Sequence, residues 1–307
     1  RALSVYMIGV TLGSGLAYMV GGAIVGHVSN MDEIILPFLG EIEAWQLTFF
    51  IVGLPGLLVS LLVATTVREP KRQGVHANDS YPPLKDVVGY VMARRRAYLG
   101  HIFGISIFIM VVYALNLWGP TYFIRLFDYS PAQAGWVFGM IMIGAGTAGL
   151  LLAGTLSDRL VNGGVQDGYI KVILFSMIAI IPCATALGFV ENDRLAIISM
   201  SVAIFFSAFQ GGISGGAIQL MTPNRMRGQV MALFLLTANL IGLGLGPTAI
   251  ALATDYVFGY DAAIGKSIAL CTVILCPMAA LILWRSLPSI NKLLDEQRRM
   301  EQTTNTE

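Results

Sequence analysis

Residues 154–160, GTLSDRL, place an aspartate beside an arginine in a short hinge between two long apolar runs. The run before the hinge, residues 136–153, reads WVFGMIMIGAGTAGLLLA, and the run after it, residues 169–190, reads YIKVILFSMIAIIPCATALGFV. Apolar runs of about 20 residues are long enough to cross a bilayer as helices. The hinge is therefore predicted to be a turn at a membrane surface between two membrane-spanning helices.

The composition extends this interpretation to the whole chain. Of the 307 residues, 56% are hydrophobic and only 12% are charged, with a mean hydropathy of +0.73. Soluble domains carry about 25% charged residues, so half that share indicates a polytopic membrane protein. The net charge of +1 gives no reason to expect a nucleic-acid partner. Cys183, Cys271 and Cys276 lie inside apolar runs without metal-ligand spacing, so we expect neither a metal nor a cofactor.

Eight apolar spans follow one another along the chain. Uninterrupted runs of this length are too long for barrel strands and lack their alternation, so helices are predicted. The predicted fold class is an all-α polytopic membrane protein with eight transmembrane helices. Their expected ranges are 4–28, 45–66, 99–122, 134–156, 169–190, 195–221, 229–252 and 267–285.

Lys and Arg are distributed unevenly between the two ends of these spans. If Arg1 is cytoplasmic, sixteen basic residues lie on that side, and only Arg125, Arg194 and Lys266 lie on the other. Cytoplasmic loops carry the excess of basic residues in membrane proteins. We therefore predict a multi-pass protein of the cell (inner) membrane with both termini of this chain in the cytoplasm.

One long polar stretch, residues 67–98, divides the spans into two that precede it and six that follow. It is predicted to be a cytoplasmic linker, either merely solvated or forming, after Pro83, a short amphipathic helix whose basic end is attracted to anionic headgroups. Six helices make a natural bundle and two do not, so the chain is interpreted as a fragment lacking four helices. The expected parts are the last two helices of an N-terminal bundle (1–66), the linker, a C-terminal six-helix bundle (99–290) and a cytoplasmic tail (291–307).

The first and seventh spans resemble each other. A shift of 229 residues places Gly13 over Gly242 and Gly15 over Gly244. Small residues let membrane helices approach closely or bend, so these glycines, with Gly246, are predicted to be helix-packing positions, and Pro247 adds a predicted kink. Duplicated halves are common in transporters, although glycine-rich membrane helices also occur without duplication.

These features resemble the major facilitator superfamily. GTLSDRL is similar to that family's signature loop at Gly154, Asp158 and Arg159, whereas the following LVNGGVQDG departs from it. GVTLGSGLAYMVGG, residues 9–22, resembles the glycine-rich motif of helix five, and VREPKR resembles the exit from helix six. The resemblance implies a major-facilitator-type fold in which the eight helices correspond to helices 5–12 of 12.

Within the superfamily, residues 222–259 most resemble bacterial Spinster-like transporters, which are related to animal carriers of sphingosine phosphate and lysolipids. The resemblance implies secondary active transport by alternating access, proton-coupled, with an amphipathic, lipid-like or organic-anion substrate. The alternative is a hexuronate-type organic anion symporter. A membrane-embedded enzyme or a channel is the alternative of another class, but the chain has no HExxH, no GxSxG and no clustered acids, so no enzyme is expected.

The resemblance also implies a role for the hinge. By the family's pseudo-symmetry, the hinge should meet the N-terminal end of the first helix, where unpaired N–H groups favour an acid. Asp158 is expected to cap or pair with that end, near Arg1, while the transporter is open outward. Gly154 would permit close approach of the two segments, and Arg159 would bind a lipid phosphate or an acid. Arg227 is the basic residue at the start of the seventh span, as Arg1 is at the start of the first. Alternatively, the hinge is simply a polar turn.

The candidate substrate cavity is lined by polar residues within the spans. No Asp, Glu, Lys or Arg lies deep in any span, so a proton-coupling acid is expected in the missing helices, while His27 and His101 are interpreted as interfacial. The resemblance places the third and sixth spans at the central cavity. These residues are predicted to contact substrate or, alternatively, to join helices: Tyr113, Asn116, Trp118, Ser207, Gln210 and Ser214.

Overall fold

The computed structural model describes residues 2–29, 31, 34–36, 40–67 and 82–304, and these are mostly helical. The α-helices are α1 Ala2–Val28, α2 Ala44–Thr66, α3 Leu84–Ala93, α4 Arg95–Phe127, α5 Pro131–Ile141, α6 Thr147–Asn162, α7 Gly168–Ala186, α8 Asp193–Ser207, α9 Gln210–Met221, α10 Arg227–Ala238, α11 Gly244–Leu252 and α12 Ile264–Thr304. The π-helical segments are η1 Met142–Gly146, η3 Asn239–Leu243 and η4 Ala253–Phe258, and the 3₁₀ turns are η2 Asn224–Met226 and η5 Asp261–Ala263. Strands β1 Ile34–Leu36 and β2 Gly40–Ile42 form an antiparallel hairpin with Ile35 opposite Glu41.

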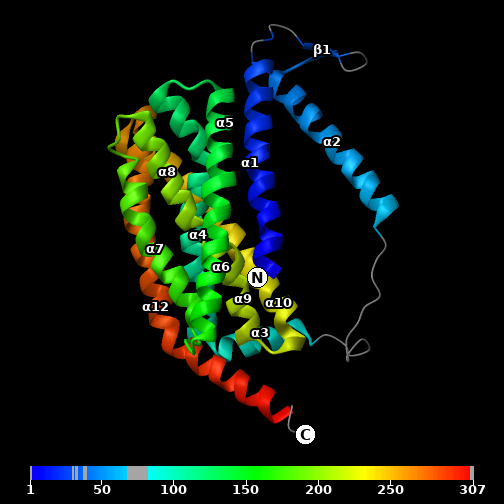
Figure 1. Ribbon diagram of the computed structural model, residues 1–307, viewed down its shortest axis with the longest axis vertical. Coiled ribbons are helices and arrows are strands. Elements are labelled where there is room, and N and C mark those ends of the chain that lie inside the picture. Colours follow the sequence, from blue (N-terminus) through cyan, green and yellow to red (C-terminus); the bar gives the residue numbers. More distant parts are fainter. Residues whose placement is uncertain (1, 30, 32–33, 37–39, 68–81, 305–307) are drawn as a thin grey trace.

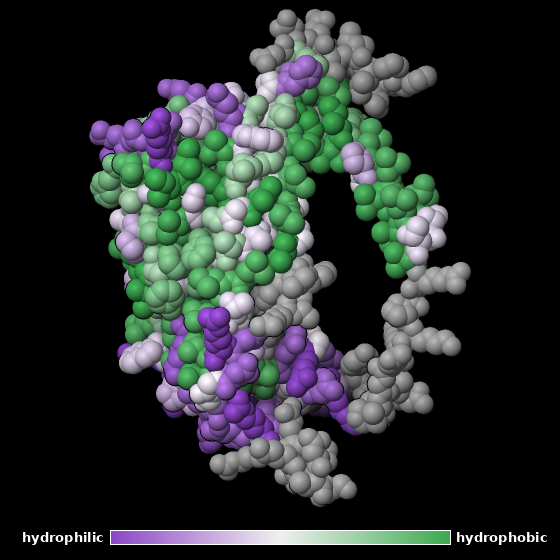
Figure 2. Space-filling view, viewed as in Figure 1, coloured by the Kyte–Doolittle hydropathy of each residue, from purple (hydrophilic) through white to green (hydrophobic). Residues whose placement is uncertain are grey.

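Eight helical spans are long and apolar enough to cross a membrane, which confirms the predicted all-α polytopic fold class. Several spans consist of more than one element, because π-helical segments or a turn interrupt them. In Figure 2 the middle of the molecule is a continuous hydrophobic surface, and hydrophilic residues gather toward its two ends. This distribution is the one expected of a chain whose middle faces lipid.

The helices from α4 to α12 form one bundle, and α1 packs along it (Figure 1). Helix α2 leaves α1 beside the β-hairpin and diverges from it, packing mainly against α1. We call this the hairpin end of the molecule, and the opposite end, where α3 crosses the bundle, the α3 end (Figure 1). The division into 1–66, 67–98, 99–290 and 291–307 stays a prediction, although α12 continues without a break into the expected tail as far as Thr304.

Two buried tyrosines connect α4 to neighbouring elements. Tyr98 and Tyr122 are fully buried, so each hydroxyl needs a partner. The Tyr98 hydroxyl donates to the carbonyl oxygen of Met221 at 2.8 Å, and the Tyr122 hydroxyl donates to that of Leu187 at 3.0 Å. Because these carbonyls lie at or just beyond the last turns of α9 and α7, the two bonds satisfy helix-terminal acceptors while fixing α4 in the core.

Small residues let α1 and α5 pack in close contact. A Cβ on Gly22 would lie 2.6 Å from the Pro131 carbonyl oxygen, and one on Gly15 would lie 2.8 Å from that of Gly139. On the facing helix, Cβ atoms on Gly135 and Gly139 would meet the carbonyl oxygens of Tyr18 and Gly15. We call this contact the α1–α5 seam; it holds α1 on the bundle through van der Waals contact between backbones.

Not every glycine predicted to pack does so. Gly242 and Gly246 face α4, where added Cβ atoms would meet the Ile109 side chain and the Met110 backbone, respectively. In contrast, Gly13 and Gly244 have no atom within 4 Å of an added Cβ in the described part of the chain. Residues two apart on a helix point in nearly opposite directions, so Gly13 faces away when Gly15 meets α5. For the same reason, Gly244 faces away from α4 when Gly242 faces it.

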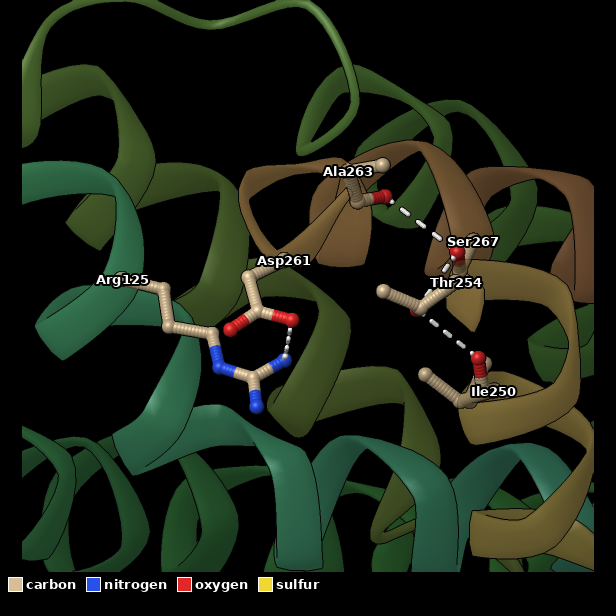
Figure 3. Close-up of polar contacts among 6 residues, drawn as sticks. All are labelled: Arg125, Ile250, Thr254, Asp261, Ala263 and Ser267. Carbon is tan, nitrogen blue, oxygen red and sulfur yellow. Dashed lines mark hydrogen bonds and ion pairs between the residues drawn. The ribbon is translucent and has the colours of Figure 1, made fainter. Parts of the chain in front are cut away.

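Polar contacts join the loops at the hairpin end. Arg125 of α4 lies 3.8 Å from Asp261 of η5 (Figure 3). The buried Thr254 hydroxyl lies 2.8 Å from the Ile250 carbonyl oxygen and 2.8 Å from the Ser267 hydroxyl, so it links η4 to α12 (Figure 3). These contacts close the bundle around the π-helical η4, whose altered hydrogen bonding leaves carbonyls for side chains to satisfy.

The seam predicts different effects for two equivalent substitutions in α1. Gly22→Ala places a methyl group against the α5 backbone, and we expect it to lower the free energy of unfolding by about 1–3 kcal/mol. Gly13→Ala adds the same group where no described atom lies within 4 Å, and should be neutral or stabilising by up to about 1 kcal/mol. Thermal unfolding of both purified variants in detergent measures the difference; equal midpoints would contradict close packing at the seam.

Candidate functional site

Three membrane spans are interrupted near one another. The π-helical segments η1 and η3 interrupt two of them, and a turn at Ala208 and Phe209 separates α8 from α9 in a third. Irregular backbone at membrane depth is tolerated only where it is buried in protein or lines a cavity, and π-helical segments often occur at functional sites. Each interruption contributes lining residues to the same cavity: Met142 and Gly146 from η1, Leu243 from η3, and Ala208 from the turn.

This central cavity lies between α1 and the bundle and has a volume of about 560 Å³. A cavity of this size accommodates a small-molecule ligand. None of its lining residues is charged, and most are apolar. The full lining set is Val10, Thr11, Ser14, Ala17, Tyr18, Val112, Tyr113, Asn116, Leu117, Met142, Gly146, Leu150, Ile204, Ser207, Ala208, Gln210, Gly211 and Leu243.

Four of the six predicted cavity residues line it: Tyr113, Asn116, Ser207 and Gln210. The Asn116 amide nitrogen donates to the Val112 carbonyl at 2.7 Å, and no described donor bonds its side-chain oxygen. The Gln210 side-chain oxygen lies 3.5 Å from the Ser214 hydroxyl, and no described acceptor bonds its amide nitrogen. In this amide assignment, the two amides therefore present one acceptor and one donor to the cavity, beside the hydroxyl groups that also line it.

The other two predicted residues, Trp118 and Ser214, do not line the cavity. The Trp118 indole N–H donates to the Pro247 carbonyl oxygen at 2.9 Å, which joins α4 to α11. Ser214 is buried within the bundle, and its carbonyl oxygen lies 3.1 Å from His101 Nε2. Trp118 and Ser214 thus make contacts between helices, which was the alternative role predicted for the six candidate cavity residues.

The cavity has a wall that the sequence analysis did not identify. Thr11, Ser14 and Tyr18 of α1 line it, and their spacing of three and four residues places them on one helix face. Tyr18 donates to the carbonyl oxygen of Asn116 at 2.8 Å, and the Thr11 and Thr147 hydroxyls lie 3.0 Å apart. This periodicity is visible in the sequence but was obscured by the interleaved glycines.

His101 is buried inside the bundle, which its position near a span end did not predict. Its side chain is fully buried, with its ring 6.0 Å from that of Phe234 and Nε2 3.1 Å from the Ser214 carbonyl oxygen. Nδ1 has no hydrogen-bond partner among the described residues. Helices α9 and α10 cover this turn of α4. The position of a residue along its own helix does not predict which neighbouring helices will bury it.

The hinge residues lie at the α3 end, but the prediction that they form a turn is wrong, because helix α6 continues through them to Asn162. Gly154 is buried in α6, and the side-chain oxygen of Asp158 accepts a hydrogen bond from the Tyr169 hydroxyl at 3.4 Å. Arg159 is exposed, and Arg227 donates from Nε to the Thr222 carbonyl at 3.0 Å. Arg1 lies outside the described residues, so the proposed contact of Asp158 near Arg1 stays a prediction.

Comparisons with known proteins agree with this geometry. A family model described as "Major Facilitator Superfamily" matches residues 1–247 and 125–303. An "MFS-type efflux pump" of Mycolicibacterium smegmatis is 24% identical over 220 residues, covering 71% of this chain and 50% of its own length. "Protein spinster homolog 1" of Homo sapiens is 24% identical over 176 residues, covering 52% of this chain and 31% of its own. The chain thus spans half or less of the length of these relatives.

The fold is also similar to that of a solved bacterial homolog of the human lysosomal transporter Spinster. Its inward-facing, unoccupied structure has a TM-score of 0.63 and 20% identity, with 97% of this chain and 70% of that chain covered. Its inward-facing, occupied structure has a TM-score of 0.59 and 19% identity. These identities are low enough that the likeness concerns the fold, whereas the family model covers most of the sequence. The chain therefore belongs to the Major Facilitator Superfamily, and its spans fold as those of a multi-pass membrane protein of that family.

Proposed function

We propose that this chain belongs to a secondary active transporter that moves an amphipathic, lipid-like substrate by alternating access, coupled to a proton gradient. Residues 1–66 would belong to one half of the carrier and residues 99–290 to the other, joined by a linker on the cytoplasmic side of the inner membrane. Inverted or parallel repeats that rock about a midplane site are the usual construction of such carriers. The likeness to Spinster proteins, one of them described as a lysosomal transporter, supports transport.

The observation that carries this proposal is the uncharged central cavity. Its wall combines leucine, isoleucine, valine and methionine side chains with the amides of Asn116 and Gln210 and the hydroxyls of α1. Such a wall suits a substrate with an apolar body and a polar group that both donates and accepts hydrogen bonds. The free-energy cost of desolvating that polar group is offset only where it forms hydrogen bonds with the amides. This requirement would orient the substrate in the cavity.

A hexuronate-type substrate fits this wall less well. A sugar acid carries a full negative charge, and burying a carboxylate requires a cationic or multiply donating partner. No Lys or Arg lines the cavity in the described part of the chain. An enzyme is favoured even less, because the same wall offers no His, Cys, Asp or Glu for acid–base or nucleophilic chemistry.

Alternating access requires contacts that separate, and the α1–α5 seam is a suitable one. Glycines and backbone carbonyls meet there, beside Met19 and the ring contact of Tyr18 with Phe138, and no ion pair between described residues would have to break. At the α3 end, Asp158 would provide the opposing gate by holding the first turn of α1. Closure at one end would then accompany opening at the other.

Transport is tested in proteoliposomes preloaded with unlabelled lysophosphatidylcholine, with counterflow of a fluorescent lysophosphatidylcholine as the readout. The proposal expects counterflow of the lipid, faster concentrative uptake under an imposed pH gradient, and no counterflow of radiolabelled glucuronate. Glucuronate counterflow without lipid counterflow would instead establish the organic-anion alternative. Equilibration of both compounds without counterflow would indicate a channel.

Gln210→Leu removes the cavity donor while keeping the side-chain size. We predict about a tenfold loss of counterflow efficiency, which corresponds to about 1.4 kcal/mol, the range of one hydrogen bond to a polar group. Gln219→Leu is the matched control, because Gln219 lies in the same helix, is exposed and does not line the cavity. Equal losses in the two variants would show that Gln210 does not contact the cargo.

Asp158→Asn tests the gate by removing the charge without changing the shape of the side chain. A carboxylate at a helix N-terminus contributes about 1 kcal/mol, so we expect a shift of several-fold toward the state in which the seam is closed. Thiol labelling of Ser14→Cys, with the native cysteines replaced by alanine, reports the opening of the cavity. Asp295→Asn, at an exposed acid near the same end, is the control. Unchanged counterflow and labelling in Asp158→Asn would exclude the gate.

A further inference from the structure

A second cavity lies at the α3 end, away from the central cavity. It has a volume of about 530 Å³ and opens between the start of α4 and the stretch of α12 from Ser289 to Glu296. Four of its lining residues are basic and one, Glu296, is acidic, so the formal charge of the lining is 4 − 1 = +3. We call it the basic cavity. Its lining residues are Ala93, Arg94, Arg95, Arg96, Ala97, Ser289, Lys292, Leu293 and Glu296.

The basic side chains carry the positive charge of this cavity. Among the residues that the structure describes, no ion pair engages Arg94, Arg95, Arg96 or Lys292. Arg94 lies with its guanidinium carbon 4.1 Å from the centre of the Tyr90 ring, which orients it without cancelling its charge. Like charges held this close repel one another, so an anion in the cavity would lower the electrostatic energy of the cluster.

Backbone donors add to the cationic side chains. Helix α4 begins at Arg95, and its N-cap residue Arg94 makes no side-chain capping bond. The N–H groups of Ala97 and Tyr98 bond to the Arg94 carbonyl at 3.0 and 3.3 Å, whereas those of Arg95 and Arg96 bond to no described residue. These free N–H groups carry the partial positive charge of a 33-residue helix. The arginine side chains and the amides thus favour the same kind of ligand.

The neighbouring helix α3 indicates where that ligand comes from. Leu84, Val88 and Met92 follow one another at four-residue intervals and remain 58%, 38% and 50% exposed, while Val87 and Val91 are buried against the protein. An exposed apolar stripe on a helix that ends in arginines is the pattern of helices that lie in the interfacial layer of a membrane. A soluble phosphate would need no such stripe beside its site.

Helix α3 is also fixed beside the basic cavity. Gln229 of α10 donates to the Pro82 carbonyl at 3.0 Å, before the helix begins, and Gln297 of α12 donates to the Tyr90 hydroxyl at 3.3 Å. The second bond links α3 to the helix that forms the opposite wall of the cavity. These hydrogen bonds therefore fix the position of the apolar stripe relative to the basic cavity.

We propose that the basic cavity binds the phosphate group of an anionic phospholipid from the leaflet at the α3 end, with the acyl chains beside the exposed stripe of α3. Arginine suits a phosphate because its planar group donates two parallel hydrogen bonds. A zwitterionic lipid would bring its own cation next to the cluster, so the site prefers a net negative headgroup. This lipid is a structural ligand, distinct from any cargo in the central cavity.

The test compares retention of two lipids by the purified full chain. The protein in detergent is equilibrated with equal amounts of dioleoyl phosphatidylglycerol and dioleoyl phosphatidylcholine, and the bound lipids are counted by native mass spectrometry. The triple variant Arg95→Gln/Arg96→Gln/Lys292→Gln should lower the preference for phosphatidylglycerol at least about tenfold, since each basic residue near a membrane surface contributes about fivefold. The control removes three exposed charges outside the cavity: Lys85→Gln/Arg285→Gln/Arg298→Gln.

A variant that should strengthen lipid binding distinguishes loss of binding from misfolding. Glu296→Gln removes the one acid in the cavity, and should raise the preference for phosphatidylglycerol about two- to fivefold. An unchanged preference in the triple variant, an equal loss in the control, or no gain in Glu296→Gln would each overturn the proposal. A final measurement adds inorganic phosphate to the lipid-bound protein. Displacement of phosphatidylglycerol by millimolar phosphate would assign the cavity to a soluble anion instead of a lipid.

Discussion

Within a bilayer, a backbone N–H or C=O that leaves the helical hydrogen-bond pattern finds no water to replace its partner. Most of this structure obeys that constraint with long helices, and three of its exceptions fall together. The π-helical segments η1 and η3 and the turn between α8 and α9 all border the central cavity. The cost of irregular backbone is tolerable where a cavity can hold water or cargo, so the fold itself marks the site.

The close approach of α1 to α5 depends on the same apolar surroundings. Lipid tails offer no hydrophobic driving force between helices, and association relies on van der Waals contact. Gly15, Gly22, Gly135 and Gly139 let backbone meet backbone along the seam. Because α1 forms one wall of the central cavity, the seam also determines whether that cavity is complete. The same few glycines therefore serve both the packing of α1 and the shape of the cavity.

Much of this arrangement could be predicted from the sequence. Hydropathy gave the eight spans, because the requirement for a long apolar helix is local. Polar residues in the third and sixth spans pointed to the cavity, and Asn116 and Gln210 do line it. Helical spacing also placed Ser214 on the face of Gln210, and the two side chains do lie 3.5 Å apart, yet Ser214 is one turn further along α9 and is buried inside the bundle. The turn between α8 and α9 interrupts a span that the sequence predicted as one helix. Such interruptions, and the burial of His101, depend on neighbouring helices and leave little mark on the local sequence.

One hydrogen bond across the central cavity has a consequence for how the protein can change over time. Tyr18 donates to the backbone carbonyl of residue 116 and not to its side chain. Every amino acid supplies that carbonyl, so replacing Asn116 alters the chemistry of the wall while the link between α1 and α4 persists. A lineage could thus acquire a new cargo at this position without losing the contact that assembles the cavity. Selectivity and assembly can evolve separately here.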